Sequence, residues 1–257
     1  MTHKPLGSII TPWGLCLTGT ALVGLLACGR DAVPEEPPVC GPSPRQAKVT
    51  GYLQCGPTLD FTPVNRYQGE FADAVAREDA VVLIGGSCTG TLIQASSGPV
   101  VLTAGHCVGL GDRPLVVFNH EEEPDGPDLV TEGTVIEQSL QPDYALLRLD
   151  VVPDVVPIPL TLEPSDRLAI IQHPRGRPKV IAEGRFAGAC NQLVYYSDLD
   201  TLVGSSGAGV LNRQGHLLGV HTDGDCNENG RGTNRGWTAE VIVEASEYLQ
   251  DIDLIGR

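Results

Sequence analysis

The segment DTLVGSSGAGV, residues 200–210, places Ser206 in a glycine-flanked turn just ahead of a short apolar run. Glycines on both sides allow a tight turn, so the amide groups of Gly204 and Ser206 can converge on one point outside the chain. Two such amides can stabilise the oxyanion that forms when a serine attacks a carbonyl group. A Ser- and Gly-rich segment is also typical of an ordinary turn. Ser206 is therefore a candidate nucleophile only if suitable partners lie nearby.

A candidate partner occurs in the segment VVLTAGHC, residues 100–107. The β-branched and apolar residues predict a buried strand, after which His106 can face a cleft while the sheet fixes its backbone. An imidazole beside a serine hydroxyl takes its proton and makes it a nucleophile. The alternative interpretation of His106 is a purely structural histidine.

The third group lies in QPDYALLRL, residues 141–149. The consecutive apolar residues after Asp143 predict a strand that is covered on both faces. An aspartate that leads into such a strand needs a hydrogen-bond donor, which the imidazole N–H of His106 would supply. A turn aspartate after Pro142 is the alternative.

The order of the three groups and the composition indicate the fold class. The α/β-hydrolases place serine first and histidine last, and their nucleophile turn ends in a glycine where this chain has Ala208, so that fold is disfavoured. The 31 glycines, 20 prolines and Val-rich runs predict an all-β fold of many short strands. A helix is predicted only near the end, where apolar residues recur with helical spacing at Ala239, Val241, Ile242, Ala245, Tyr248 and Leu249.

Together these segments resemble the chymotrypsin-like serine proteases, especially the bacterial branch that contains the glutamyl endopeptidases. Further matches are SCTGTLI at 87–93, FN at 118–119, IQHP at 171–174 and LGVH at 218–221. The resemblance implies two six-stranded antiparallel β-barrels with a C-terminal helix and an active site in the cleft between the barrels. It also implies a trypsin-like serine endopeptidase that hydrolyses peptide or protein substrates through an acyl-enzyme.

The resemblance assigns a role to each candidate residue. His106 would act as general base and then acid, Asp143 would orient it, and Ser206 would attack the scissile carbonyl. The amides of Gly204 and Ser206 would form the oxyanion hole. Ser205 stands where the animal digestive enzymes have an aspartate that pairs with a freed amino terminus, so that ion pair is not expected here.

A second class of function is a catalytically inactive binding module on a protease fold. Such proteins usually lose one member of the triad, whereas all three residues are present here. The proposed acyl transfer needs no metal and no organic cofactor, so we expect none. We also expect a monomer.

Three residues give conflicting indications of the side chain preferred before the scissile bond. Thr201 and His221 resemble the glutamyl endopeptidase pocket, where a hydroxyl and an imidazole receive an acidic side chain. Asp200 instead takes the place of the aspartate that binds cations in the trypsin pocket, where it would attract Lys or Arg and repel Glu. The preferred residue stays open, with acidic residues slightly ahead.

The amino-terminal region predicts export. Residues 1–28 contain Lys4 and an apolar stretch that is too short and too interrupted for a membrane span, as in a signal peptide. Its end, Leu25 to Cys28, resembles a bacterial lipobox in which Cys28 is acylated, and a plain secretory signal is the alternative. Residues 29–65 predict an extended linker, and residues 66–257 the protease domain. We expect a lipoprotein of the bacterial envelope, attached to the membrane only through its lipid anchor, or a secreted protein.

Cysteine usage agrees with export. Of the 8 cysteines, Cys16 lies in the signal and Cys28 is the acylation candidate, which leaves an even number that can form disulfides. The resemblance pairs Cys88 with Cys107. We expect the other pairs to be Cys190 with Cys226 and Cys40 with Cys55. A zinc site is disfavoured, because the sequence has no C-x-x-C or H-x-x-x-H spacing.

The formal net charge of −15 argues against nucleic acid as a partner, because phosphate binding needs a basic face. The acidic clusters at residues 121–123 and 223–228 lack the full carboxylate-and-glycine pattern of a calcium loop. We therefore expect a solvated acidic surface at both places and no metal site.

Overall fold

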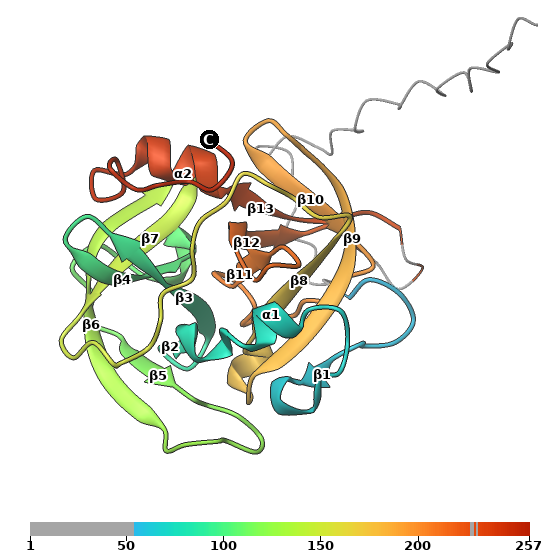
Figure 1. Cartoon of the computed structure of the whole chain (residues 1–257), viewed down its shortest axis with the longest axis horizontal. Coiled ribbons are helices and arrows are strands. Elements are labelled where there is room, and N and C mark those ends of the chain that lie inside the picture. Colours follow the sequence, from blue (N-terminus) through green and yellow to red (C-terminus); the bar gives the residue numbers. More distant parts are fainter. Residues whose placement is uncertain (1–53, 227–228, 230) are drawn as a thin grey trace, which may run out of the picture. The chain divides into compact units, whose positions relative to one another are not determined.

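A computed structural model describes residues 54–257 except for 227, 228 and 230. The expected export signal, the acylation candidate Cys28, Cys16, Cys40 and most of the expected linker lie outside the described residues. Strands dominate the described part (Figure 1), and none of its helices is both long and apolar enough to cross a membrane.

The first six long strands close into an antiparallel barrel in the order β2-β3-β4-β7-β6-β5. In β7 (Asp143–Leu149), residues 144–147 are all buried, as predicted from their consecutive apolar side chains. In β6 (Leu129–Leu140), the strand before it, buried and exposed residues alternate near the start. The strands of this barrel are β2 (Val81–Ile84), β3 (Cys88–Ala95), β4 (Gly98–Thr103), β5 (Leu115–Phe118), β6 (Leu129–Leu140) and β7 (Asp143–Leu149).

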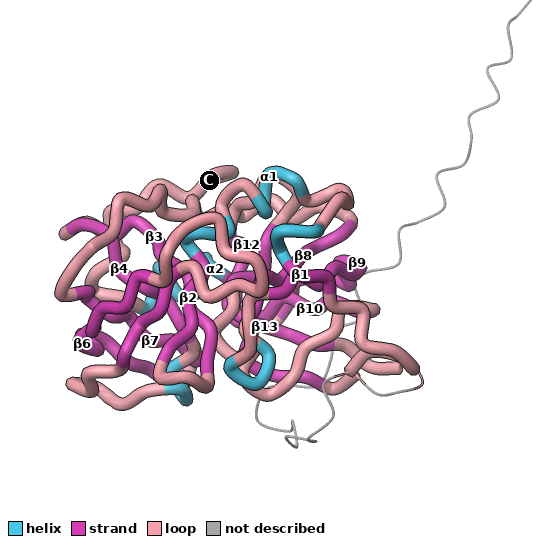
Figure 2. Tube along the Cα trace, turned by 90° about the horizontal axis from the view of Figure 1, so that it is seen from below, coloured by secondary structure: helices cyan, strands magenta, loops and turns pink. Residues whose placement is uncertain are grey.

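The next six strands form a second antiparallel barrel, which closes because the first of them pairs with both the second and the fourth. They are β8 (Arg167–Gln172), β9 (Val180–Cys190), β10 (Leu193–Ser197), β11 (Gly209–Leu211), β12 (Leu217–Gly224) and β13 (Asn234–Thr238). The predicted two-barrel fold is confirmed. The tube in Figure 2 shows the two groups of strands side by side, joined by loops.

The helices are short. They are α1 (Ala72–Val75), α2 (Ala239–Ala245) and the 3-10 turns η2 (Val64–Arg66), η3 (Glu78–Ala80), η4 (Gly105–Cys107) and η5 (Pro174–Gly176). The predicted C-terminal helix is confirmed as α2, although it ends before Tyr248 and Leu249. The Thr238 hydroxyl caps its first turn by accepting a hydrogen bond from the Val241 amide at 3.4 Å.

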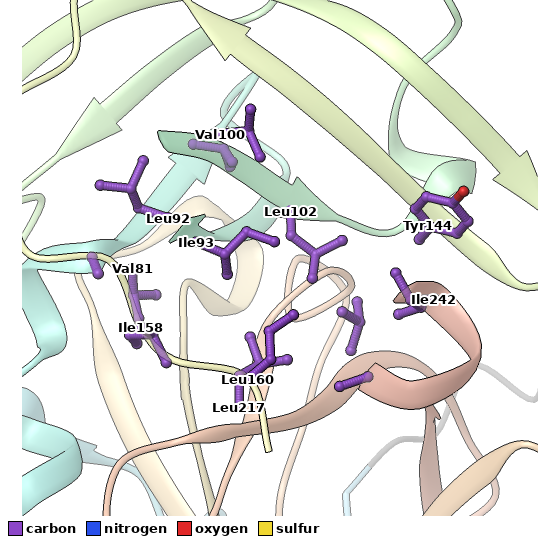
Figure 3. Packing of buried hydrophobic residues seen from close by; sticks show 14 of the residues in the cluster. Val81, Leu92, Ile93, Val100, Leu102, Tyr144, Ile158, Leu160, Leu217 and Ile242 are labelled. Atoms are coloured by element: carbon purple, nitrogen blue, oxygen red, sulfur yellow. The ribbon is translucent and has the colours of Figure 1, made fainter. Parts of the chain in front are cut away.

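One continuous apolar core joins the two barrels and the C-terminal helix. Figure 3 shows Leu92 and Leu102 of the first barrel above Ile158 and Leu160 of the connecting segment, Leu217 of β12 beside Leu160, and Ile242 of α2 near Tyr144 of β7. Burial of this apolar surface holds the barrels in contact, so residues at their junction keep a fixed arrangement.

The end of the expected linker is part of the folded unit. The short strand β1 (Thr62–Pro63) pairs antiparallel with the start of β9. Upstream of it, the amides of Cys55 and Asp60 bind the Asp200 carboxylate. Residues 54–65 therefore pack on the second barrel, which differs from the extended linker that we expected up to residue 65.

The disulfides correct two predicted pairs. The Cys88–Cys107 bond is confirmed, but Cys226 pairs with Cys55 rather than Cys190. The pairing of Cys40 with Cys55 is therefore wrong as well. Cys190 is also disulfide-bonded. The prediction failed because the folded residues upstream of β1 bring Cys55 to Cys226 across 171 positions of sequence.

A buried lysine also corrects the predicted acidic surface. Glu121 is buried, and its carboxylate accepts a 2.9 Å hydrogen bond from the ammonium group of Lys179, which also contacts the Glu78 carboxylate. Burial raises the pKa of Glu78 to about 7. The next residues, 122 and 123, are exposed as expected. Lys179 thus supplies the positive charge for this cluster, which joins the residue before β9 of the second barrel to the segments that precede β2 and follow β5 of the first.

Candidate active site

The backbone brings His106 and Asp143 together. Strand β4 leads into η4, which carries His106, and β4 pairs with β7, which begins at Asp143. The Asp143 carboxylate accepts hydrogen bonds from the His106 amide at 2.9 Å and from its ring Nδ1 at 2.7 Å. Both carboxylate oxygens are used, so the ring has a fixed orientation.

This contact sets the protonation of the imidazole. The Asp143 hydrogen bond raises the pKa of His106, burial opposes the rise, and the charges of Asp143 and Asp223 add to it. With Nδ1–H donating to the carboxylate, Nε2 of the neutral ring can accept a proton. The pair has the chemistry of a general base with an orienting carboxylate.

Ser206 lies in the loop between β10 and β11, next to the first barrel. Its carbonyl accepts a 2.9 Å hydrogen bond from the Thr89 amide and lies 3.8 Å from Sγ of Cys107, the residue after His106. Among the described residues the Ser206 hydroxyl has no hydrogen bond to the His106 ring. Such contacts are often long in free enzymes and tighten in the substrate complex.

The nucleophile loop leaves two amides free. Gly204 and Gly207 have φ angles of +100° and +88°, so the loop makes the tight turn that its sequence predicted. The amides of Ser205 and Gly207 donate to the carbonyls of Leu202 and His221 at 2.9 and 2.8 Å. Within residues 54–257, outside the undescribed gaps, the amides of Gly204 and Ser206 donate to no other group. These are the two amides expected in an oxyanion hole.

Thr89 fastens this loop to the first barrel. Its buried hydroxyl donates to the Gly204 carbonyl at 2.8 Å and accepts from the His173 amide at 3.0 Å. Its own amide holds the Ser206 carbonyl. Thr89 therefore binds the carbonyls of both residues whose amides are free.

The three expected pocket residues are all buried, and their polar groups are engaged inside the protein. The Asp200 carboxylate binds the amides of Cys55 and Asp60 at 2.7 and 2.6 Å, while burial raises its pKa. The Thr201 hydroxyl accepts a hydrogen bond from Asn234 at 3.2 Å. The His221 backbone is hydrogen-bonded to the two residues that follow Ser206: its carbonyl accepts from the Gly207 amide and its amide donates to the Ala208 carbonyl, both at 2.8 Å.

His221 is neutral in this environment. Burial lowers the pKa of His221 to about 3, with smaller contributions from the charges of His106 and Arg235. The Tyr196 hydroxyl is hydrogen-bonded to its Nδ1 at 2.5 Å, and burial raises the pKa of Tyr196, so the hydroxyl keeps its proton. The imidazole is thus an uncharged part of the second barrel.

Sequence reasoning did not assign a role to Thr89, or to the charge of Asp223, which helps to raise the pKa of His106. Thr89 lies in the quoted segment SCTGTLI, but its role depends on a partner, Gly204, that is 115 positions away. No local pattern marks such a residue. The cysteine before it offered an indirect signal, since the Cys88–Cys107 bond places this strand beside His106.

The model of the trypsin-like peptidase domain matches residues 88–220, about half of the chain and all three candidate residues. The chain belongs to the trypsin-like peptidases. This match confirms the family and the class of serine endopeptidase. It specifies no branch, so the resemblance to glutamyl endopeptidases stays a prediction. No curated protein matches the chain.

Solved structures support the fold of this trypsin-like peptidase. A serine endoprotease from Yersinia pestis is 19% identical, with a TM-score of 0.58, over 72% of this chain and 69% of that one. The inactive form of the Rv3671c protease from M. tuberculosis H37Rv is 20% identical, with a TM-score of 0.54, over 71% of this chain and 93% of that one.

We predict that kcat/KM for a peptide substrate rises with pH, with a midpoint above the ordinary histidine value of 6.5. The neutral imidazole is the base, and Asp143 raises the pKa of His106, so activity is lost as the pH falls through that raised value. Asp143→Asn should lower the midpoint and reduce kcat by about 10⁴-fold. A midpoint that does not move in the variant would contradict the assignment of Asp143.

Replacing Thr89 with valine should slow turnover and lower the free energy of unfolding by about 1–3 kcal/mol, because the Gly204 carbonyl and the His173 amide lose a buried partner. Thr91→Val is the matched control. Thr91 lies on the same strand, is equally buried, and its hydroxyl has no hydrogen-bond partner in the described part of the chain. Equal losses in both variants, measured by denaturant melts and peptide hydrolysis, would exclude the bridging role of Thr89.

Proposed function

We propose that the chain hydrolyses peptide bonds through His106, Asp143 and Ser206. The Ser206 hydroxyl attacks the scissile carbonyl carbon and passes its proton to Nε2 of His106. The carbonyl oxygen becomes an oxyanion held by the amides of Gly204 and Ser206. His106 then protonates the leaving amine as the C–N bond breaks, and a water molecule hydrolyses the ester with His106 again as base.

The observation that carries this proposal is the two-point contact of Asp143 with His106. A carboxylate that binds both the amide and the ring Nδ1 fixes one tautomer and one ring orientation, as a general base requires. The two unengaged amides of the nucleophile loop support the same chemistry. An inactive binding module would need neither feature.

A fluorophosphonate probe tests the nucleophile directly. We expect it to label the folded wild-type chain once, at Ser206, and to leave Ser206→Ala unlabelled. Ser205→Ala is the matched control for the site of labelling: it should still take the label at Ser206, although more slowly, because the buried Ser205 hydroxyl is not the nucleophile but accepts a hydrogen bond from the Leu202 amide within the loop. A cooperatively melting wild-type chain that takes no label would favour the binding module instead.

Two disulfides among the described residues are typical of an extracellular or periplasmic protein. The export signal and the acylation of Cys28 are part of the proposal, and they would tether the peptidase to a membrane surface.

Labelled palmitate tests the lipid anchor. When the chain is expressed with it in a bacterial host, the wild type should carry the label and Cys28→Ala should not. Cys16→Ala is the control that keeps it. Label retained in Cys28→Ala would contradict the lipid anchor.

A further inference from the structure

The carboxylate of Asp200 binds backbone amides of the segment upstream of the barrels. Its Oδ1 accepts a hydrogen bond from the Cys55 amide at 2.7 Å, and its Oδ2 accepts one from the Asp60 amide at 2.6 Å. The residue is 2% exposed. Because each oxygen has an amide donor, the buried charge is compensated within the protein.

Two further contacts hold the same upstream segment in place. Cys55 is covalently bound to Cys226, which follows β12. The Asn234 side-chain amide, on β13, lies within 3.4 Å of the Cys55 sulfur and also donates to the Leu199 carbonyl at 2.9 Å. Residues 55–60 are therefore fastened at several points to the strands and loop that surround the start of the nucleophile loop.

Hydrogen bonds also hold the segment that runs from Asp200 to Ser206. The Asp200 carbonyl accepts a 2.8 Å hydrogen bond from the Gln172 side chain, which fixes the beginning of the loop. Beyond it, Leu202 and Ser205 close a small ring of two hydrogen bonds: the Ser205 amide donates to the Leu202 carbonyl, and the Leu202 amide donates to the Ser205 hydroxyl. This ring spans residues 202–205, so it includes Gly204 and ends directly before Ser206.

We propose that Asp200 is a positioning residue: it anchors residues 55–60 at the start of the nucleophile loop and so keeps Gly204 and Ser206 in their working arrangement. This inference rests on the proposed function. It differs from the role that the position of Asp200 in the sequence suggests, which is to receive a cationic substrate side chain. With Ser205 in place of an aspartate, the loop has no ion pair to a freed amino terminus, and the upstream segment supplies the support instead.

Comparison of Asp200→Asn with Asp198→Asn tests the proposal in the full chain. Asp198 lies two residues earlier, is exposed, and pairs with Arg185 at the surface at 2.8 Å. In Asp200→Asn, one of the two amides should face the new NH₂ group and lose its acceptor. We expect the rate of fluorophosphonate labelling, measured well below the melting temperature, to fall by about 10- to 100-fold. Peptides with Lys, Glu or Ala before the scissile bond should all lose kcat by the same factor, and Asp198→Asn should behave as the wild type.

The double variant Cys55→Ala with Cys226→Ala tests the same support without changing Asp200. It should also slow labelling while the chain still melts cooperatively. A lower melting temperature with unchanged labelling would overturn the proposal, because Asp200 would then only stabilise the fold. A loss confined to the Lys peptide would overturn it in favour of a cation receptor. A wild-type chain that folds but takes no label would refute the proposed function itself, and with it the inference.

Discussion

The active site depends on one residue, Thr89, whose backbone and side chain bind across the junction of the two barrels. Its amide and its hydroxyl hold the carbonyls of Ser206 and Gly204, so a strand of the first barrel sets the shape of a loop of the second. The residue before Thr89, Cys88, forms a disulfide bond with Cys107, the neighbour of His106. A single short strand thus aligns the nucleophile loop and the base with each other.

This alignment holds because the barrels cannot move apart at low cost. The apolar core runs from one barrel through the connecting segment to α2. On another part of the junction, Lys179 is buried between two glutamates of the first barrel, and separating charges from such a buried cluster is strongly unfavourable. Apolar burial supplies the attraction, and the ion pairs specify one relative position of the barrels.

The sequence was informative where function follows from local pattern and poor where it follows from long-range contact. The apolar run after Asp143 predicted a strand, and pairing of that strand with β4 then brings Asp143 to His106 without further assumptions. Glu121 was misjudged because its burial depends on Lys179, 58 positions later. The role of Asp200 was not visible either, since its partners lie about 140 positions earlier. Cysteine counting, likewise, shows that pairs can form but not which ones.

The bond between Cys55 and Cys226 has a consequence for the order of biosynthesis. Its two ends are 171 positions apart, so the ring that it closes cannot exist until nearly the whole peptidase has been translated. Thiols stay reduced in the cytosol of most cells, and such bonds form after transport into an oxidising compartment. Nascent chains on a ribosome in the cytosol therefore lack this covalent closure, and the complete covalent architecture requires an oxidising environment of the kind found in the periplasm or outside the cell.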